Sequence, residues 1–242
     1  MNKKSILKRL ALLSVGALII PTFATAEIKM GIILGFTGPI ESLTPDMANS
    51  AELAFKEASD SGQLLGGQKI SVVRADSTCI DAAAASAAAE RQITSDKVVG
   101  IMGADCSGVT TAIANNVAIP NGVTMISPSA TSPALSTIAD NGYFFRTAPS
   151  DARQGQVLAQ ITIERGINTV AVTFTNNDYG KGLSDSFINA YKGLGGKVSA
   201  VVPHDEGKAD YSAEVGALDA SGADVLAVFG YVDQGGRNII QG

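Results

Sequence analysis

Three short segments of the sequence combine glycine with serine or threonine, and each directly follows a short apolar run. They are residues 35–39 (GFTGP), 103–108 (GADCSG) and 127–133 (SPSATSP). In an open sheet of parallel strands, ligands bind beyond the carboxyl ends of the strands, where these segments would lie. Because hydroxyl groups both donate and accept hydrogen bonds, we expect a binding site for a small polar molecule at this edge.

The hydroxyl groups of the second and third segments are the first candidate ligands. Ser107 directly precedes a helical pattern, so its hydroxyl and the nearby backbone N–H groups could bind an anion, and a carboxylate would fit. In the third segment Ser129, Ala130 and Thr131 are candidates together. Each hydroxyl also has a purely structural explanation, Ser107 as a helix N-cap and the other two as turn residues. Hydroxyls in successive loops at one edge favour binding.

Two tyrosines occupy equivalent places in the second half of the chain. Tyr179 lies in residues 175–180 (TNNDYG), and Tyr231 comes almost directly after the apolar run of residues 224–229 (DVLAVF). Each could offer a ring and a hydroxyl to a ligand. The alternative is a tyrosine that only packs at the start of a helix. We include both in the candidate site.

Residues 1–26 have the three parts of a secretory leader. A basic region from Lys3 to Arg9 precedes an apolar stretch over residues 10–20, and a small-x-small site ends at Ala26. The apolar stretch is shorter than the roughly 20 residues that span a bilayer. We therefore expect an exported protein that is cleaved after Ala26 and begins at Glu27.

Two cysteines, Cys79 and Cys106, lie 27 positions apart. In an exported protein an even number of cysteines favours a disulfide, and closing this loop would contribute about 3–4 kcal/mol. A reactive or metal-bound thiol is the alternative. Zinc is poorly supplied, because His204 is the only histidine and a structural zinc usually takes four ligands.

The sequence lacks the common enzyme motifs, namely the nucleophile elbow, the phosphate loop and the dinucleotide fingerprint. A serine or cysteine mechanism would have to use His204, which lies in a polar stretch at residues 203–210 (PHDEGKAD) and is predicted to be a surface residue. We expect no catalytic residue, no cofactor and no metal.

The charge balance bears on the class of partner. The leader carries four of the 18 basic residues, which leaves 14 against 23 acidic residues in the mature chain. A net charge of about −9 argues against nucleic acid, whose binding needs a basic face.

Short apolar runs alternate with helical patterns, which predicts an α/β fold with parallel sheets covered by helices on both faces. Two blocks follow the leader at residues 1–26: residues 27–146 and residues 147–242. The second block has three clear strands and ends within a helical pattern, so we expect a truncated chain. The predicted strands are residues 28–34, 69–75, 98–102, 123–126, 143–146, 169–174, 197–202 and 224–229, and the predicted helices are 46–61, 82–95, 108–117, 152–165, 179–194 and 211–220, with a last one from about 235.

Several of these segments, in this order and spacing, resemble the type I periplasmic binding proteins, specifically the leucine/isoleucine/valine-binding group of ABC-importer receptors. The resemblance covers nearly all of the mature chain. The segments are residues 35–39 (GFTGP), 76–79 (DSTC), 103–107 (GADCS), 127–133 (SPSATSP), 145–147 (FRT), 151–155 (DARQG), 178–183 (DYGKGL), 210–212 (DYS) and 230–231 (GY).

The resemblance implies two Rossmann-like lobes that close on a ligand in the cleft between them. It implies that Ser107 binds the ligand carboxylate, and that Ser129 and Thr131 contact the carboxylate and the ammonium group. Tyr231 would help to hold the ammonium end, and Tyr179 would be a further cleft residue. The family disulfide would join Cys79 to Cys106.

Two departures from the family pattern matter. A cleft tyrosine in the first loop of some relatives is replaced here by Leu43 or is shifted, which leaves the side-chain preference open. Relatives are also longer, and an acidic residue that pairs with the ligand ammonium would lie beyond Gly242, so we expect an incomplete second lobe.

The sequence therefore predicts a periplasmic receptor that binds an amino acid, branched-chain or similar, and delivers it to the membrane permease of an ABC importer. Two alternatives stay open: an extracellular sensor domain, and the same kind of receptor for an amide, urea or an aromatic acid.

Overall fold

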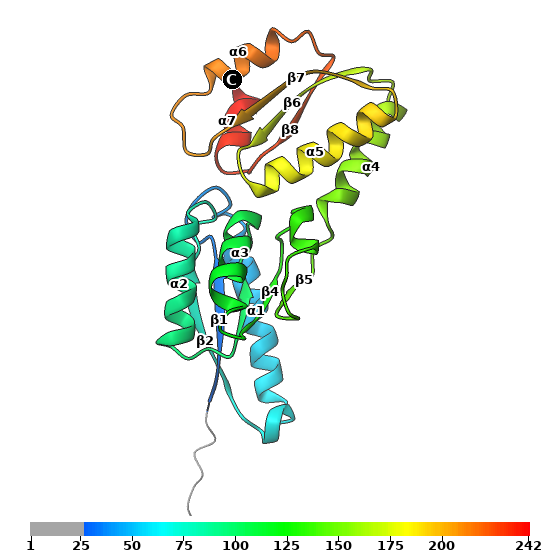
Figure 1. Ribbon diagram of the computed structural model, residues 1–242. Helices are drawn as coiled ribbons and strands as arrows, with labels where there is room; N and C mark the ends of the chain where they lie inside the picture. The colour runs from blue at the N-terminus through cyan, green and yellow to red at the C-terminus, as the bar shows by residue number, and fades with distance from the viewer. Residues whose placement is uncertain (1–26) are drawn as a thin grey trace, which may run out of the picture.

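The computed structural model of the chain describes residues 27–242, and the predicted leader lies outside the described residues. The described chain forms two lobes, each a parallel sheet flanked by helices (Figure 1). The expected α/β fold with two Rossmann-like lobes is confirmed.

The first lobe contains a five-stranded sheet in the order β2-β1-β3-β4-β5, in which all neighbours are parallel. Its elements are β1 (Ile28–Leu34), α1 (Thr44–Asp60), the 3-10 turn η1 (Leu64–Gly66), β2 (Ile70–Asp76), α2 (Ala82–Thr94), β3 (Gly100–Gly103), α3 (Ser107–Ile113), the π-helical turn η2 (Ala114–Ala118), β4 (Thr124–Ser127), the 3-10 turn η3 (Pro133–Ser136) and β5 (Phe144–Arg146).

The alternation of β1 divides the core of the first lobe into two layers. Ile32 and Leu34 pack on α1 together with Ala48, while Ile33 packs on the other face against α2 and α3. Because both faces are apolar, the sheet is covered by helices on both sides. The small residues of α2 allow this helix to lie close to the sheet, and the Asp81 side chain caps its first turn as its sequence position suggested.

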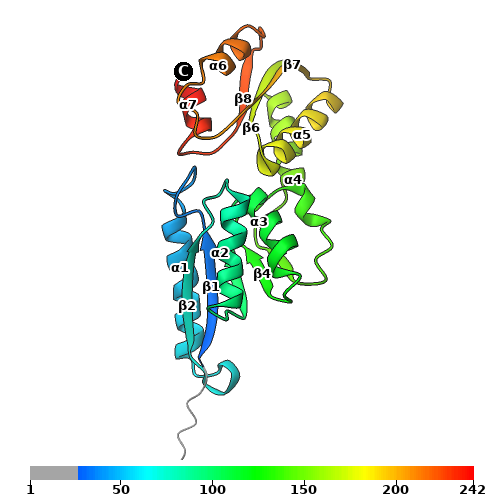
Figure 2. The same ribbon diagram turned by 60° about the vertical axis from the view of Figure 1, so that its left-hand side comes forward.

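The second lobe contains a three-stranded parallel sheet in the order β7-β6-β8. Helices α4 and α5 cover one face of this sheet, and α6 and α7 lie on the other face (Figure 2). Its elements are α4 (Asp151–Glu164), β6 (Thr169–Thr175), α5 (Asp178–Gly193), β7 (Lys197–His204), α6 (Ser212–Asp219), β8 (Val225–Phe229) and α7 (Gly235–Gln241).

Burial in the second sheet is uneven. The central strand β6 is largely buried, but Val201 of β7 is 46% exposed, and Val225 and Leu226 of β8 are 39% and 38% exposed. The expectation that apolar strands are covered on both faces is therefore wrong for these residues. The reason is topological, since β7 and β8 each have only one neighbouring strand in the described chain.

The predicted elements are present, and their ends differ by a few residues. The clearest difference is at α3, where a single helix was expected over residues 108–117. The α-helix ends at Ile113, and the chain continues as the π-helical turn Ala114–Ala118.

Residues 147–150 carry the chain from β5 into α4, and so from one lobe to the other. Beyond this connection, α5 of the second lobe packs on η3 of the first. Gly182 lies so close to Pro133 that a Cβ atom at this position would be 2.7 Å from the Pro133 Cδ atom. The loops that follow β1, β3 and β4 face the second lobe in both ribbon views.

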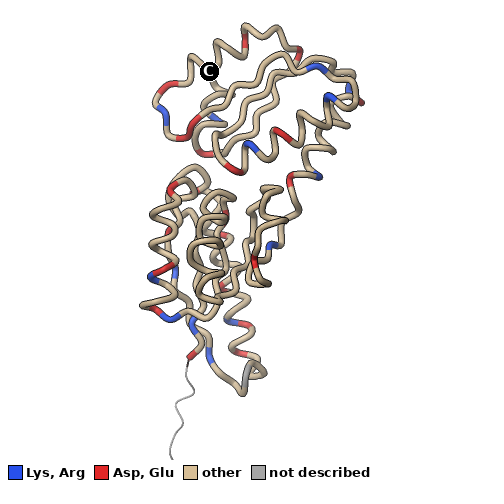
Figure 3. The backbone as a smooth tube through the Cα atoms, viewed as in Figure 1, with Lys and Arg blue, Asp and Glu red and all other residues tan. Residues whose placement is uncertain are grey.

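Basic and acidic residues are interspersed along the backbone of both lobes (Figure 3). In the part of the chain that the structure describes, no helix is long and apolar enough to cross a membrane.

Candidate functional site

A cavity of about 260 Å³ lies where the loops of the two lobes meet. The first lobe contributes Ser107, Ser129 and Thr131, and the second contributes Tyr179 and Tyr231. The loops that the sequence placed at the carboxyl edge of the sheet thus surround one space.

Ser107 connects two of these loops. It is the first residue of α3 and is 1% exposed, and its hydroxyl accepts hydrogen bonds from the backbone N–H groups of Thr131 (3.2 Å) and Ser132 (3.1 Å). Ser129 donates its hydroxyl proton to the carbonyl oxygen of Asp105 at 3.0 Å. These three bonds hold the loop at residues 127–133 against the start of α3.

Ala130 lies behind the cavity and does not line it. It is fully buried, its N–H group donates to the Ser127 hydroxyl, and its carbonyl accepts from the Arg146 guanidinium at 3.2 Å. Arg146 donates as well to the carbonyl of Ser132 at 2.8 Å. The candidate Ala130 is therefore part of the loop's support in this structure, together with an arginine from β5.

Asp105 is a lining residue that the sequence reasoning did not single out, although it lies within the GADCS segment. Its carboxylate accepts hydrogen bonds from the N–H groups of Gly35 (2.7 Å) and Cys106 (2.9 Å) and from the hydroxyl of Ser77 (3.2 Å). Burial raises the pKa of this carboxyl above its usual value, and the hydrogen bonds from these donors offset only part of that rise. The side chain joins the ends of β1, β2 and β3.

A disulfide joins Cys79 to Cys106 beside the cavity. It links the loop after β2 to the loop after β3, directly before Ser107. Because it closes a separation of 27 positions, it stabilises the folded lobe by about 3–4 kcal/mol in the chain-entropy model.

The two tyrosines stack on each other with their ring centroids 5.2 Å apart. Tyr231 comes from the second lobe, yet it belongs to the apolar cluster of the first lobe and is only 8% exposed. Its hydroxyl accepts a hydrogen bond from the Asn177 amide at 3.2 Å. Burial raises the pKa of both phenols, that of Tyr179 to about 12, so both are neutral donors at neutral pH.

Part of the cavity lining is apolar. Ile40, Leu43 and Met47 line it from the first loop and the start of α1. A pocket lined by both hydrogen-bonding and aliphatic groups matches a ligand that has both.

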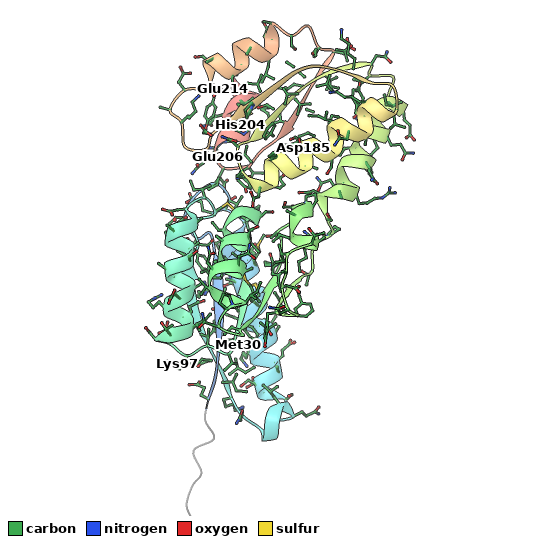
Figure 4. The ribbon with its side chains drawn as sticks, in the orientation of Figure 1. Met30, Lys97, Asp185, His204, Glu206 and Glu214 are labelled. Atoms are coloured by element: carbon green, nitrogen blue, oxygen red, sulfur yellow. A yellow bond between two sulfur atoms is a disulfide. The ribbon has the colours of Figure 1, made fainter. Side chains whose placement is uncertain are left out.

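His204 is not a surface residue, and that prediction is wrong. It ends β7 with 1% exposure, its Nδ1 atom lies 2.8 Å from the hydroxyl of Thr173 on β6, and its Nε2 atom lies 3.7 Å from a carboxylate oxygen of Glu206 (Figure 4). Glu206 in turn accepts from the N–H group of Gly235 at 2.8 Å. The polar sequence around His204 does not indicate this burial, because the ring is covered by Tyr211, by Gly230 and by Gly235 at the start of α7, which are up to 31 positions later in the chain.

Burial lowers the pKa of His204 and raises the pKa of Glu206. The pair lies outside the cavity. Among the described residues no group of three or more histidine, cysteine and acidic side chains could hold a metal ion.

Comparison with known proteins identifies the family of this chain. A family model described as periplasmic binding protein matches residues 27–240. The chain belongs to this family. The expected resemblance to its leucine/isoleucine/valine-binding group is confirmed by the relatives described next.

The family includes proteins whose names state a solute. The chain is 33% identical to the Leu/Ile/Val-binding protein homolog 3 of Brucella melitensis over 218 residues, which cover 88% of this chain and 57% of the relative. It is 28% identical to the leucine-specific-binding protein of Salmonella typhimurium over 216 residues, or 89% of this chain and 57% of the relative.

Solved structures give the same picture. A leucine-binding protein of Thermotoga maritima has a TM-score of 0.71 at 28% identity and covers 83% of this chain and 55% of its own. A second structure is a branched-chain amino acid transporter substrate-binding protein of Streptococcus pneumoniae, solved with isoleucine. It has a TM-score of 0.72 at 28% identity, and the match covers 84% of this chain and 57% of the other chain. The chain spans between 54% and 64% of the length of the curated relatives it matches.

Proposed function

We propose that this protein is a solute receptor of an ABC importer that binds a branched-chain or similar amino acid between its two lobes. The observation that carries the proposal is the cavity itself. Its lining divides into polar residues from the loops around Ser107 and Thr131 and aliphatic residues from the first loop and α1, and Tyr231 lines it from the second lobe.

An aliphatic amino acid has the same division into a charged end and an apolar end. A closed cleft that hydrogen-bonds the charged end discriminates against solutes that lack those groups, because its buried polar groups would then lose their partners. The relatives named for leucine, isoleucine and valine support this class of solute.

The proposal includes a periplasmic location and a membrane permease as the partner. The leader predicted at residues 1–26 would direct the chain to the periplasm, and cleavage would follow Ala26. Delivery of the solute would require contact with the membrane permease of the importer, as in the family. A receptor role agrees with the family, whose named members bind solutes.

A thermal-shift panel tests the proposal. The mature protein is heated with L-leucine, L-isoleucine, L-valine, urea, acetamide, benzoate or glucose. A ligand at about 100 times its Kd adds roughly 2.7 kcal/mol to the stability, which raises the Tm by roughly 5–10 °C at this size.

We expect such a shift with one or more of the aliphatic amino acids. A shift with benzoate, urea or acetamide alone would replace the amino acid by one of these solutes. No shift with any compound would contradict the receptor proposal for this chain.

A further inference from the structure

Asp151 is a buried acidic residue without a hydrogen-bond partner. It begins α4, directly after the Ser150 N-cap, and is fully buried. Neither of its carboxylate oxygens has a hydrogen bond of normal geometry to any described residue. Because an unpartnered buried carboxylate is costly, such a group in a native fold calls for an explanation.

The surroundings of Asp151 explain only part of this cost. The positive end of the α4 dipole favours a negative charge at this position. Burial raises the pKa of Asp151, and the nearby charge of Arg146 offsets only part of this rise. The Arg146 guanidinium donates its hydrogen bonds to the carbonyls of Ala130 and Ser132 instead. No described group therefore donates a hydrogen bond of normal geometry to the Asp151 carboxylate.

Thr131 is a cavity-lining residue that lies next to Asp151. The backbone of the two residues is joined, since the Asp151 N–H group donates to the Thr131 carbonyl at 2.9 Å. The Thr131 hydroxyl lies close enough to lower the pKa of the Asp151 carboxyl, and Thr131 lines the cavity. Asp151 itself does not line it.

We propose that Asp151 is a positioning residue that sets the polarity of the Thr131 hydroxyl. Its carboxylate accepts the Thr131 hydroxyl proton when a ligand is bound, which leaves the two lone pairs of that oxygen directed at the ligand. A hydroxyl has one proton. Once Thr131 donates this proton to Asp151, its oxygen can only accept hydrogen bonds from a ligand in the cavity.

This arrangement makes the Thr131 side of the cavity favour a ligand N–H donor over a carboxylate. It deepens the proposed function and rests on it, because it assigns the ammonium end of an amino acid to Thr131. Asp151 then acts on specificity without touching the ligand.

A double-mutant cycle tests this role. The affinity for L-leucine is measured by titration calorimetry for the unsubstituted protein, Asp151→Asn, Thr131→Ala and the double variant. We expect Asp151→Asn alone to weaken binding about tenfold, because a neutral amide oxygen is a weaker acceptor than a carboxylate and the amide NH2 group can donate to the Thr131 hydroxyl instead. In the Thr131→Ala background the same change should weaken binding by no more than about twofold.

Two further variants separate this role from a structural one. Thr131→Ser keeps the hydroxyl, so Asp151→Asn should retain its full effect in that background. Asp178→Asn removes the corresponding first-turn carboxylate of α5, which is exposed, and should leave the affinity within about twofold.

Equal effects of Asp151→Asn with and without the Thr131 hydroxyl would show that Asp151 only supports the fold and would overturn the inference. An unchanged affinity in Asp151→Asn would overturn it as well. If the unsubstituted protein does not bind L-leucine, the proposed function fails for this solute and the inference falls with it, which is a different result from binding without coupling.

Discussion

The hydroxyls of Ser107 and Thr131 have different tasks in the same corner of the cavity. Ser107 accepts two backbone N–H groups and so holds the loop at residues 127–133, whereas the Thr131 hydroxyl has no such bond and borders the cavity. Ser132, next in the chain, is buried and does not line the cavity.

This difference gives a prediction for three alanine variants. Ser107→Ala and Thr131→Ala should each weaken L-leucine binding about tenfold, because one frees two buried donors and the other removes a polar contact. Ser132→Ala should stay within about twofold, and calorimetric titration measures all three. Equal affinities for the three variants would place the ligand elsewhere.

A second residue-scale prediction concerns pH. The folded-state pKa of His204 is lowered by burial, against about 6.5 in the unfolded chain. Above pH 6.5 neither state binds the proton. Below it the unfolded state binds the proton first, so His204 makes the protein lose stability as the pH falls, by up to about 1.4 kcal/mol per pH unit.

The charged groups of Glu206, Glu214, Asp205 and Lys208 lie near His204, and the raised pKa of Glu206 acts on stability in the opposite sense. The comparison is therefore with His204→Gln, which removes only the histidine. Urea unfolding between pH 8 and pH 5.5 should show the two proteins diverging below about pH 6.5, with the variant less sensitive. Parallel curves would mean that the imidazole binds its proton as readily in the folded protein as in the unfolded chain.

At the scale of elements, the contact between α4 and α5 depends on one glycine. A Cβ atom at Gly155 would lie 2.6 Å from the backbone nitrogen of Phe187 and from the Cβ atom of Ser186. The two helices can approach this closely only because α4 has no side chain at that point.

Gly155→Ala should therefore destabilise the protein by about 1–3 kcal/mol, although alanine is the better helix former. Gly216→Ala in α6 is the matched control, since a Cβ atom there meets nothing within 4 Å. That change should stabilise the protein by about 0.5–1 kcal/mol, as judged from urea unfolding. Destabilisation by both changes would show that backbone geometry, and not helix packing, is responsible.

The elements themselves were the predictable part of this fold. The periodicity of apolar residues located the strands and helices within a few positions, and Asp81 marked a helix start that the structure retains. Such features depend on residues that are neighbours in the sequence. The glycine- and hydroxyl-rich loops after β1, β3 and β4 were predictable for the same reason.

The roles that sequence reasoning missed depend on distant partners. Arg146 of β5 and Asp151 of α4 hold the loop at residues 127–133, and although both lie in segments that carry the family resemblance, no local pattern indicates these contacts. His204 was assigned to the surface because its neighbours are polar, but its cover comes from another element. Val225 and Leu226 looked like core residues, yet their strand lies at the edge of its sheet.

At the scale of the whole molecule, Tyr231 and its loop hold the two lobes together. The ring of Tyr231 belongs to the first lobe's apolar cluster. The Asp233 carboxylate accepts from the N–H group of Ser42 at 3.0 Å, and the backbone N–H group of Asp233 donates to the carbonyl of Pro39 at 3.1 Å. One loop of the second lobe thus makes both apolar and polar contacts with the first.

Tyr231→Ala should weaken this closure and shift the protein toward a more open arrangement. Small-angle scattering should then give a larger radius of gyration than for the unsubstituted protein. Tyr143→Ala, which removes a ring within the first lobe, should leave the radius of gyration unchanged. An unchanged radius in Tyr231→Ala would mean that the Asp233 contacts alone suffice.

The stacked pair of Tyr179 and Tyr231 has an optical consequence. The chain has five tyrosines and no tryptophan, so tyrosine emission is its entire intrinsic fluorescence. Two of these five emitters lie between the lobes with their rings 5.2 Å apart. The surroundings of two of the five emitters change at once when the separation of the lobes changes or when a molecule enters beside the rings. Ligand binding can therefore be followed by the ultraviolet emission of the protein, without a dye.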